Sequence, residues 1–126
     1  MRPYVHDLFR RMRDPDPVRR DAAFDAVLFE RADALPDLYA AYVFFADDAL
    51  LRFFAVQLMG FAGSKEAVDT LIVALNDPDP AVRAEACRSL EDLRARSAIR
   101  ALRARLDDLD PEVRRAAAEA MEVLAK

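Results

Sequence analysis

The residue types that carry out chemistry in enzymes are few and scattered in this sequence. Cys87 is the only cysteine and His6 the only histidine. Nucleophilic catalysis needs a Ser, Cys or Thr beside an oriented base, and the serines, Ser64, Ser89 and Ser97, lie far along the chain from His6. One histidine cannot build a histidine-rich metal site, and one cysteine cannot form an internal disulfide. The sequence therefore predicts no enzyme, no metal and no cofactor.

Composition favours a helical protein. The chain has 126 residues, 54% of them hydrophobic and 33% charged, a formal net charge of -4 and only two glycines. This length suits one domain spanning residues 1–126, and so few glycines argue against a β-barrel or a phosphate-binding loop. The longest apolar run, residues 38–46, is too short to span a membrane, and the N-terminus has no signal-peptide pattern. We expect an all-α, cytoplasmic protein.

The elements that must position any functional residue follow from an internal repeat. DPDPAVRAEACRSLEDL at 77–93 returns in altered form as DPEVRRAAAEAMEVL at 110–124. Aligning the arginines of these segments, at a period of 31 to 33 residues, gives a column of four: Arg19, Arg52, Arg83 and Arg114. Small or apolar residues follow three, seven and ten positions later, in the first repeat Ala22, Ala26 and Phe29. These offsets trace one face of an α-helix.

A second helix follows in each repeat. Its apolar residues recur at the same distance from the arginine: Leu35, Leu38, Tyr42; Val68, Leu71, Leu75; and Ile99, Leu102, Leu106. The first thirteen residues have the same internal spacing at Val5, Leu8 and Met12. The chain is therefore predicted to hold about eight helices, arranged as a half-unit, three full units and a half-unit.

Asp-Pro pairs mark where the first helices begin. Aspartate caps unpaired N–H groups, and proline at the first helical position loses no hydrogen bond. The DPDP motif at 14–17 stands one residue closer to Arg19 than the motif at 77–80 stands to Arg83. We interpret this difference as a one-residue deletion in the first repeat.

The segments 77–83 and 110–114, with Ala86, Leu90 and Ala117, resemble HEAT-like repeats, especially the short bacterial kind named after phycobilisome lyases. The second repeat diverges, with Asp47-Asp48 and no proline before Leu51. The resemblance implies a right-handed α-solenoid. In such a fold the first helices line the convex side and the second helices the concave side. It identifies a scaffold and not an activity.

The regular column of arginines is expected to be structural, with ligand contact as the alternative. An arginine near a helix start can make a bidentate bond to an aspartate one repeat away and so fix the stacking. The candidate partners are Asp16, Asp47 or Asp48, Asp79 and Asp110. Cys87 falls beside the alanine position of its repeat, so we expect a buried thiol. His6 is expected on the surface or at an end face.

Function should lie in the positions that vary between repeats. On the second helices these positions run from an aromatic end through an acidic and aliphatic middle to a basic end. The predicted partner-binding residues on this concave face are Tyr39, Phe44, Asp69, Ile72, Arg96, Arg100 and Arg103. This mixture favours a module or scaffold that binds a protein partner. A nucleic-acid-binding protein and an accessory subunit of a lyase-type enzyme are the alternatives. Each half of the chain is net acidic, which disfavours nucleic acid.

Aromatic residues lie only in the first half of the chain and include two neighbouring pairs, Phe44-Phe45 and Phe53-Phe54. Because neighbours on a helix do not share a face, we expect one member of each pair to point outward or into a loop.

Self-association through a chain end is also expected. Ala116, Ala120 and Val123 should form the outward side of the last helix, where a terminal cap would be charged. Tyr4 and Phe9 should lie on the outward side of the first helix, so that a second copy of the chain could cover either end.

Overall fold

The computed structural model describes all residues, 1–126, as eight α-helices joined by short loops and 3-10 turns. The helices are α1 (Pro3–Arg11), α2 (Pro17–Leu28), α3 (Leu35–Phe44), α4 (Ala49–Phe61), α5 (Val68–Ala74), α6 (Pro80–Asp92), α7 (Ile99–Ala104) and α8 (Pro111–Leu124). There are no strands. The sequence prediction of an all-helical protein with eight helices is confirmed. No helix has the length and apolar character needed to cross a membrane.

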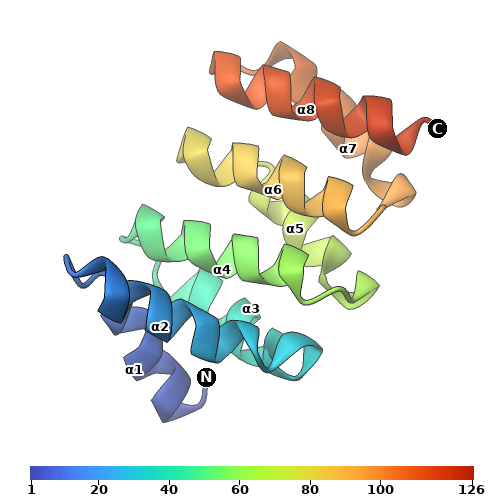
Figure 1. Cartoon of the computed structure of the whole chain (residues 1–126). Helices are drawn as coiled ribbons and strands as arrows, with labels where there is room; N and C mark the ends of the chain where they lie inside the picture. Colours follow the sequence, from blue (N-terminus) through green and yellow to red (C-terminus); the bar gives the residue numbers. More distant parts are fainter.

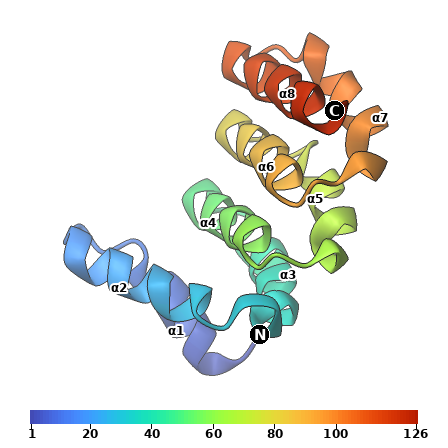
Figure 2. The ribbon, with the colours of Figure 1, turned by 45° about the vertical axis from the view of Figure 1, so that its right-hand side comes forward.

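The helices form two stacked layers, as expected for an α-solenoid. Figures 1 and 2 show α2, α4, α6 and α8, hereafter the A helices, in one layer, and α1, α3, α5 and α7, hereafter the B helices, in the other. The most extensive contacts join α4 to α6 and α6 to α8, and each B helix packs on the A helix that follows it. The two ends of the chain therefore lie at opposite ends of the stack.

The A helices begin at the predicted Asp-Pro signals. Four aspartates cap them by accepting a hydrogen bond from a backbone N–H group of the first turn: Asp16, Asp48, Asp79 and Asp110. Proline follows the cap in α2, α6 and α8, where its missing N–H costs no hydrogen bond. Local chemistry thus sets the start of each A helix.

The buried face of α2 is shifted by one residue from the predicted one. Ala22 and Ala26 are exposed and Phe29 is 87% exposed, whereas Ala23 and Val27 are buried. The apolar stripe predicted for the first repeat was therefore wrong.

The residues that follow α2, α4 and α6 show which arginine of the first repeat is equivalent to Arg52 and Arg83. The three helices α2, α4 and α6 are each followed by a residue in the left-handed conformation, a common helix end, with φ between 53° and 74°: Arg31, Gly63 and Arg94. Gly63 and Arg94 stand 11 residues after Arg52 and Arg83, so the first-repeat equivalent is Arg20 and not Arg19. With Arg20 as the reference, the DPDP motifs at 14–17 and 77–80 are equally spaced, and no deletion is needed.

One hydrophobic core of 35 buried residues runs through all the helices. Most of the apolar positions predicted for the B helices belong to it, among them Leu38, Leu71 and Leu102. Leu106 is the exception at 36% exposed, because α7 ends at Ala104 and a 3-10 turn follows. In the B helices, the period of the sequence therefore placed the core correctly except at Leu106.

The tightest approach lies between α4 and α6. Gly60 is buried, and a Cβ atom added there would stand 2.6 Å from the Oγ of Ser89 and 2.9 Å from its Cα. Ser89 is itself buried and donates a hydrogen bond of 3.0 Å to the carbonyl of Val56. Ser89 of α6 therefore joins the two helices.

The end faces differ from the expected ones. Ala116 and Ala120 are buried, because this side of α8 packs against α6 rather than facing outward. Phe9 is also buried, and Tyr4 is 49% exposed. Only Val123 is partly exposed on α8 as expected.

Candidate interaction surfaces

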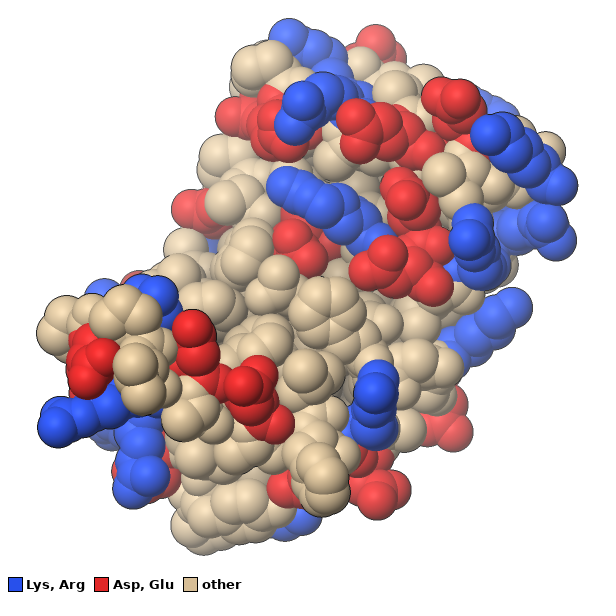
Figure 3. Space-filling model, in the orientation of Figure 1, with Lys and Arg blue, Asp and Glu red and all other residues tan.

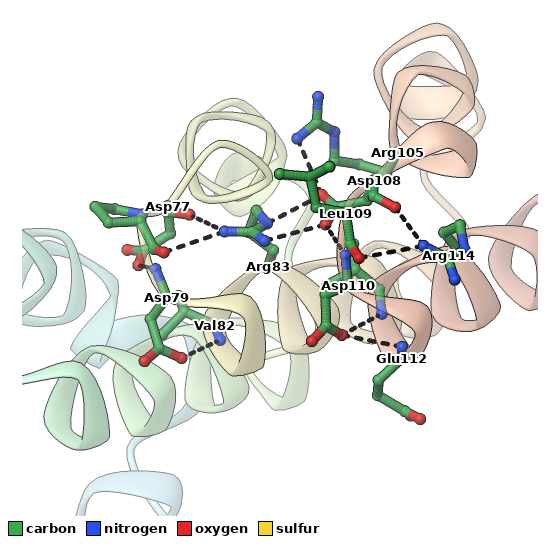
Figure 4. Close-up of polar contacts among 12 residues, drawn as sticks. Asp77, Asp79, Val82, Arg83, Arg105, Asp108, Leu109, Asp110, Glu112 and Arg114 are labelled. Carbon is green, nitrogen blue, oxygen red and sulfur yellow. Dashed lines mark hydrogen bonds and ion pairs between the residues drawn. The ribbon is translucent and has the colours of Figure 1, made fainter.

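Arg52 and Arg83 join successive repeats through the same set of hydrogen bonds. The Nε and Nη2 of Arg52 donate to the two carboxylate oxygens of Asp77 at 2.9 and 3.1 Å, and those of Arg83 donate to Asp108 at 3.0 Å each. The Nη1 of each arginine donates to two backbone carbonyls in the loop before its own helix. Figure 4 shows Arg83 between its own loop and Asp108 of the next repeat. A bidentate charge-assisted pair of this kind fixes both distance and orientation.

The aspartate of each pair is the first of its Asp-Pro-Asp or Asp-Leu-Asp motif, and the predicted partners were wrong. Asp79 and Asp110 accept hydrogen bonds from the first N–H groups of α6 and α8, so capping occupies their side chains. Asp77 and Asp108 stand two residues earlier, and each also accepts the backbone N–H of the capping aspartate, at 2.9 and 3.0 Å. One aspartate therefore starts the helix, and the other receives the arginine of the preceding repeat.

These acceptors are buried as ions. Burial by itself would raise the pKa of Asp77, but hydrogen bonds from Arg52 and from the hydroxyl of Tyr42 outweigh it and hold the pKa below its ordinary value. The pKa of Asp108 is lowered in the same way, with burial opposed by Arg83 and by a backbone N–H group. Both carboxylates are therefore charged at neutral pH and have their donors in place.

The other two arginines of the predicted column do not reach a carboxylate in the next repeat. Arg19 is exposed, and its nearest acid is Asp16 of its own repeat at 3.7 Å. The reason is the register of α2, which puts Arg20 at the position that Arg52 and Arg83 hold in their repeats. We call the arginine at this position the ladder arginine, and we call the aspartate that stands six residues before it, such as Asp77 or Asp108, the ladder aspartate. Arg114 donates Nη1 to the carbonyls of Asp108 and Leu109 and makes no ion pair.

The junction between α2 and α4 lacks the arginine–aspartate pair. Ala46 stands six residues before Arg52, where Asp77 and Asp108 stand before Arg83 and Arg114. Arg20 therefore has no acceptor in the next repeat, and its nearest acid is the adjacent Asp21 at 3.6 Å. Figure 2 shows α2 set further from α4 than α4 is from α6.

Aromatic side chains occupy this looser junction on the A-helix side. Phe24 of α2 meets Phe54 and Phe61 of α4 edge-to-face, with ring centroids 5.9 and 6.4 Å apart. A small groove of about 180 Å³ between the two helices is lined by Phe24 and Phe54 with Arg20, Asp21 and Gln57. In Figure 3 charged side chains crowd over α6 and α8, while the centre of the view, over α4, is largely uncharged. The Phe53-Phe54 pair does not divide into a buried and an outward ring as expected, since both rings are half-buried.

The B-helix face carries most of the predicted partner-binding residues. Asp69, Arg100 and Arg103 are exposed, while Tyr39 and Ile72 are half-buried against the core. Residues 69, 72, 73 and 76 share one side of α5 and its C-terminal extension, since they are spaced by three or four positions. The predicted partner-binding set did not include Val43 and Val73, which are 75% and 62% exposed on α3 and α5.

Two of the predicted residues already have contacts within the fold. Phe44 is 63% exposed but packs edge-to-face on His6 of α1, with ring centroids 5.0 Å apart. Its neighbour Phe45 is buried, so this pair divides as expected. Arg96 donates Nε to the carbonyl of Leu124 at the end of α8, at 3.2 Å.

Two titratable groups in the core have raised pKa values. Cys87 is fully buried, and burial raises the pKa of its thiol to about 12, so the reactive thiolate does not form near neutral pH. Burial also raises the pKa of Glu85 to about 6, despite Arg88 nearby. No cluster of side chains has the composition of a metal site.

Comparison with known families adds one finding. A family model described as HEAT repeats matches residues 36–122. A comparison with curated proteins finds no match.

Proposed function

Since the chain belongs to the HEAT repeat family, we propose that it is a protein-binding module without catalysis of its own, whose partner lies along the B-helix face. HEAT repeats generally mediate protein–protein interaction or scaffolding. We also propose that these repeats are of the short bacterial type named after phycobilisome lyases, because the segments 77–83 and 110–114 resemble that type.

The exposed apolar side chains of the B helices carry this proposal. Val43 and Val73 contribute nothing to the buried core, yet each leaves most of its surface in water. Exposed apolar residues that recur on one face of a repeat protein mark a contact surface. Half-buried Tyr39 and Ile72 widen this surface, and tyrosine is enriched among residues that dominate interface energies.

The charges at the C-terminal end of the same face suggest the character of the partner. Arg100 and Arg103 of α7 are exposed and make no ion pair. Two acidic residues share this face: Asp69 lies on α5, and Asp107 lies in the turn that follows α7. A partner segment with apolar side chains and an acidic end would satisfy both regions. The acidic neighbours disfavour nucleic acid, which binds to a continuous basic stripe.

Paired substitutions test the proposal. The variant Val43→Asp/Val73→Asp should lose the partner that the unaltered protein captures from its native cell extract. Val18→Asp is a matched control, because Val18 is 76% exposed at the start of α2 on the other layer. Capture that survives Val43→Asp/Val73→Asp, or that is lost with Val18→Asp, would contradict a B-helix site. Tight, salt-sensitive binding of DNA that Arg100→Ala/Arg103→Ala abolishes would favour the nucleic-acid alternative.

A further inference from the structure

The two ends of the stack hold complementary halves of the bond that joins the repeats. Arg114 of α8 is a ladder arginine with no aspartate, and Asp14, before α2, is a ladder aspartate with no arginine. We propose that copies of this chain associate head to tail, with Arg114 of one copy bound to Asp14 of the next. This contact is independent of the B-helix face proposed above.

Arg114 is already held in the conformation that the paired arginines adopt. Its Nη1 donates to the carbonyls of Asp108 and Leu109 at 2.7 and 3.3 Å, as the Nη1 of Arg83 does to Asp77 and Pro78 at 2.8 and 3.2 Å. In Arg83 the remaining Nε and Nη2 hold the next aspartate, while those of Arg114 have no acceptor. Figure 4 shows both arginines against their own loops. Little side-chain entropy remains to be lost when Arg114 binds a carboxylate.

Asp14 likewise has the position and the backbone hydrogen bond of the paired aspartates. It stands six residues before Arg20, as Asp77 does before Arg83, and accepts the backbone N–H of Asp16 at 2.8 Å. The equivalent bonds to Asp77 and Asp108 measure 2.9 and 3.0 Å. Asp14 makes no ion pair within the chain. Its carboxylate therefore has the local geometry of an acceptor and lacks only the guanidinium.

The face of α2 next to Asp14 is built to receive a helix. Positions two and six residues after the ladder arginine are buried in α6, as Glu85 and Ser89, and in α8, as Ala116 and Ala120. In α2 the same positions are Ala22 and Ala26, and both are exposed. They line a groove of about 550 Å³ between α1 and α2: its apolar residues are Leu8, Ala22, Ala23 and Ala26, and its polar residues are Arg11, Asp14 and Arg19.

The outward face of α8 fits this groove in size. Val56 of α4, four residues after its ladder arginine, meets Ser89 of the next helix, and the equivalent on α8 is the exposed Ala118. A small side chain there allows close approach to Ala22 and Ala26.

The contact joins two different surfaces, so it does not close on itself. A head-to-tail interface generates rings or open chains rather than a two-fold dimer. Association should therefore increase steadily with concentration and pass through dimers and trimers.

Sedimentation velocity over a wide concentration range tests the proposal, using the purified chain and reversed charges. The unaltered chain should exceed its 14.2 kDa monomer mass at high concentration. Asp14→Arg and Arg114→Asp should each stay monomeric, since both place like charges in the contact. An equimolar mixture of the two variants should associate again, because each end then meets an opposite charge. Asp69→Arg and Arg103→Asp reverse the same charges on the B-helix face and should behave as the unaltered chain does.

Two results would overturn the proposal. One is a monomer at every concentration for the unaltered chain. The other is association that persists in Asp14→Arg and in Arg114→Asp, which would locate the contact elsewhere. Recovery in the mixture excludes misfolding of either variant as the cause of its monomeric state. Loss of partner capture by Val43→Asp/Val73→Asp is measured separately, so failure of one proposal leaves the other standing.

Discussion

The stack of α4, α6 and α8 and the junction between α2 and α4 are built from the same repeat but are joined differently. Between α4, α6 and α8, Arg52 and Arg83 each bind an aspartate of the next repeat, and α4 and α6 approach as closely as Gly60 and Ser89 allow. Between α2 and α4, Ala46 replaces that aspartate and phenylalanine rings fill the space. The arginine–aspartate pair between two repeats thus depends on one side chain in the loop, and the junction between α2 and α4 lacks it.

The loop before α4 also has its own ion pair. Arg13, which follows α1, donates Nη1 to both carboxylate oxygens of Asp48, at 2.7 and 2.8 Å. Arg13 is exposed, so this pair contributes little, and it joins α4 to the end of a B helix rather than to α2. At the start of α1, the backbone N and the Nε of Arg2 donate to the buried Asp37 of α3 at 2.7 Å each, so α1 is held to α3. The contact expected to open most readily is therefore that of α2 with α4.

The largest effect on stability is expected from breaking the arginine–aspartate pair between α4 and α6. Asp77→Ala leaves the buried guanidinium of Arg52 and the hydroxyl of Tyr42 without their acceptor, and loss of one partner of a buried ion pair costs about 3–5 kcal/mol. Urea unfolding should show this loss. Arg20→Ala at the unlocked junction is the control and should change stability very little. Equal losses in the two variants would refute the distinction between the junctions.

The close approach of α4 and α6 gives the next effect. Gly60→Ala forces apart two helices whose nearest atoms include the backbone of Ser89, and such overpacking costs about 1–3 kcal/mol. Ala26→Leu adds a larger group to the exposed side of α2 and should leave the unfolding free energy nearly unchanged. If Gly60→Ala unfolds at the same urea concentration as the unaltered protein, the contact is not as tight as described.

Glu85 of α6 makes the folding stability of the protein depend on pH. It shares a face of α6 with Ser89, and its raised pKa means that the folded state holds a proton that the unfolded state has released. Stability should therefore fall as pH rises from about 4 to about 6, by about 1–2 kcal/mol in total. Glu85→Gln should remove this fall and be the more stable protein at pH 7. A Glu85→Gln protein with the same pH profile as the unaltered one would place the titration elsewhere.

The smallest effect on stability is expected from adding the arginine–aspartate pair that the junction between α2 and α4 lacks. Ala46→Asp supplies a carboxylate in the loop where Asp77 and Asp108 stand, and Arg20 is the arginine that should bind it. Because Arg20 is partly exposed, the gain should be about 0.5–1 kcal/mol. The same substitution in an Arg20→Ala background should give no gain. A gain that survives loss of Arg20 would have another cause.

Much of this fold could be predicted from local chemistry and periodicity. Asp-Pro caps and apolar spacing placed the eight helices, because both signals act within one helix. The register of α2 was missed because Arg19 and Arg20 are adjacent and only the buried face distinguishes them. Asp77 and Asp79 are likewise both plausible partners in the sequence, and the capping geometry that excludes Asp79 appears only in three dimensions.

The surfaces were harder to predict than the core. Repeat spacing identified the exposed positions of Asp69, Arg100 and Arg103 on the B helices. It did not distinguish the inward side of α8, where Ala116 and Ala120 lie, from the outward side, where Ala118 lies. Alanine is compatible with both, so only the packing of α6 on α8 assigns the faces.

Hydrogen exchange measured helix by helix tests the central claim most directly. If the arginine–aspartate bonds lock the repeats, amides of α2 should exchange through a lower-energy opening than amides of α6. Ala46→Asp should slow exchange in α2 while leaving α6 unchanged. Equal protection of α2 and α6 in the unaltered protein would contradict the account.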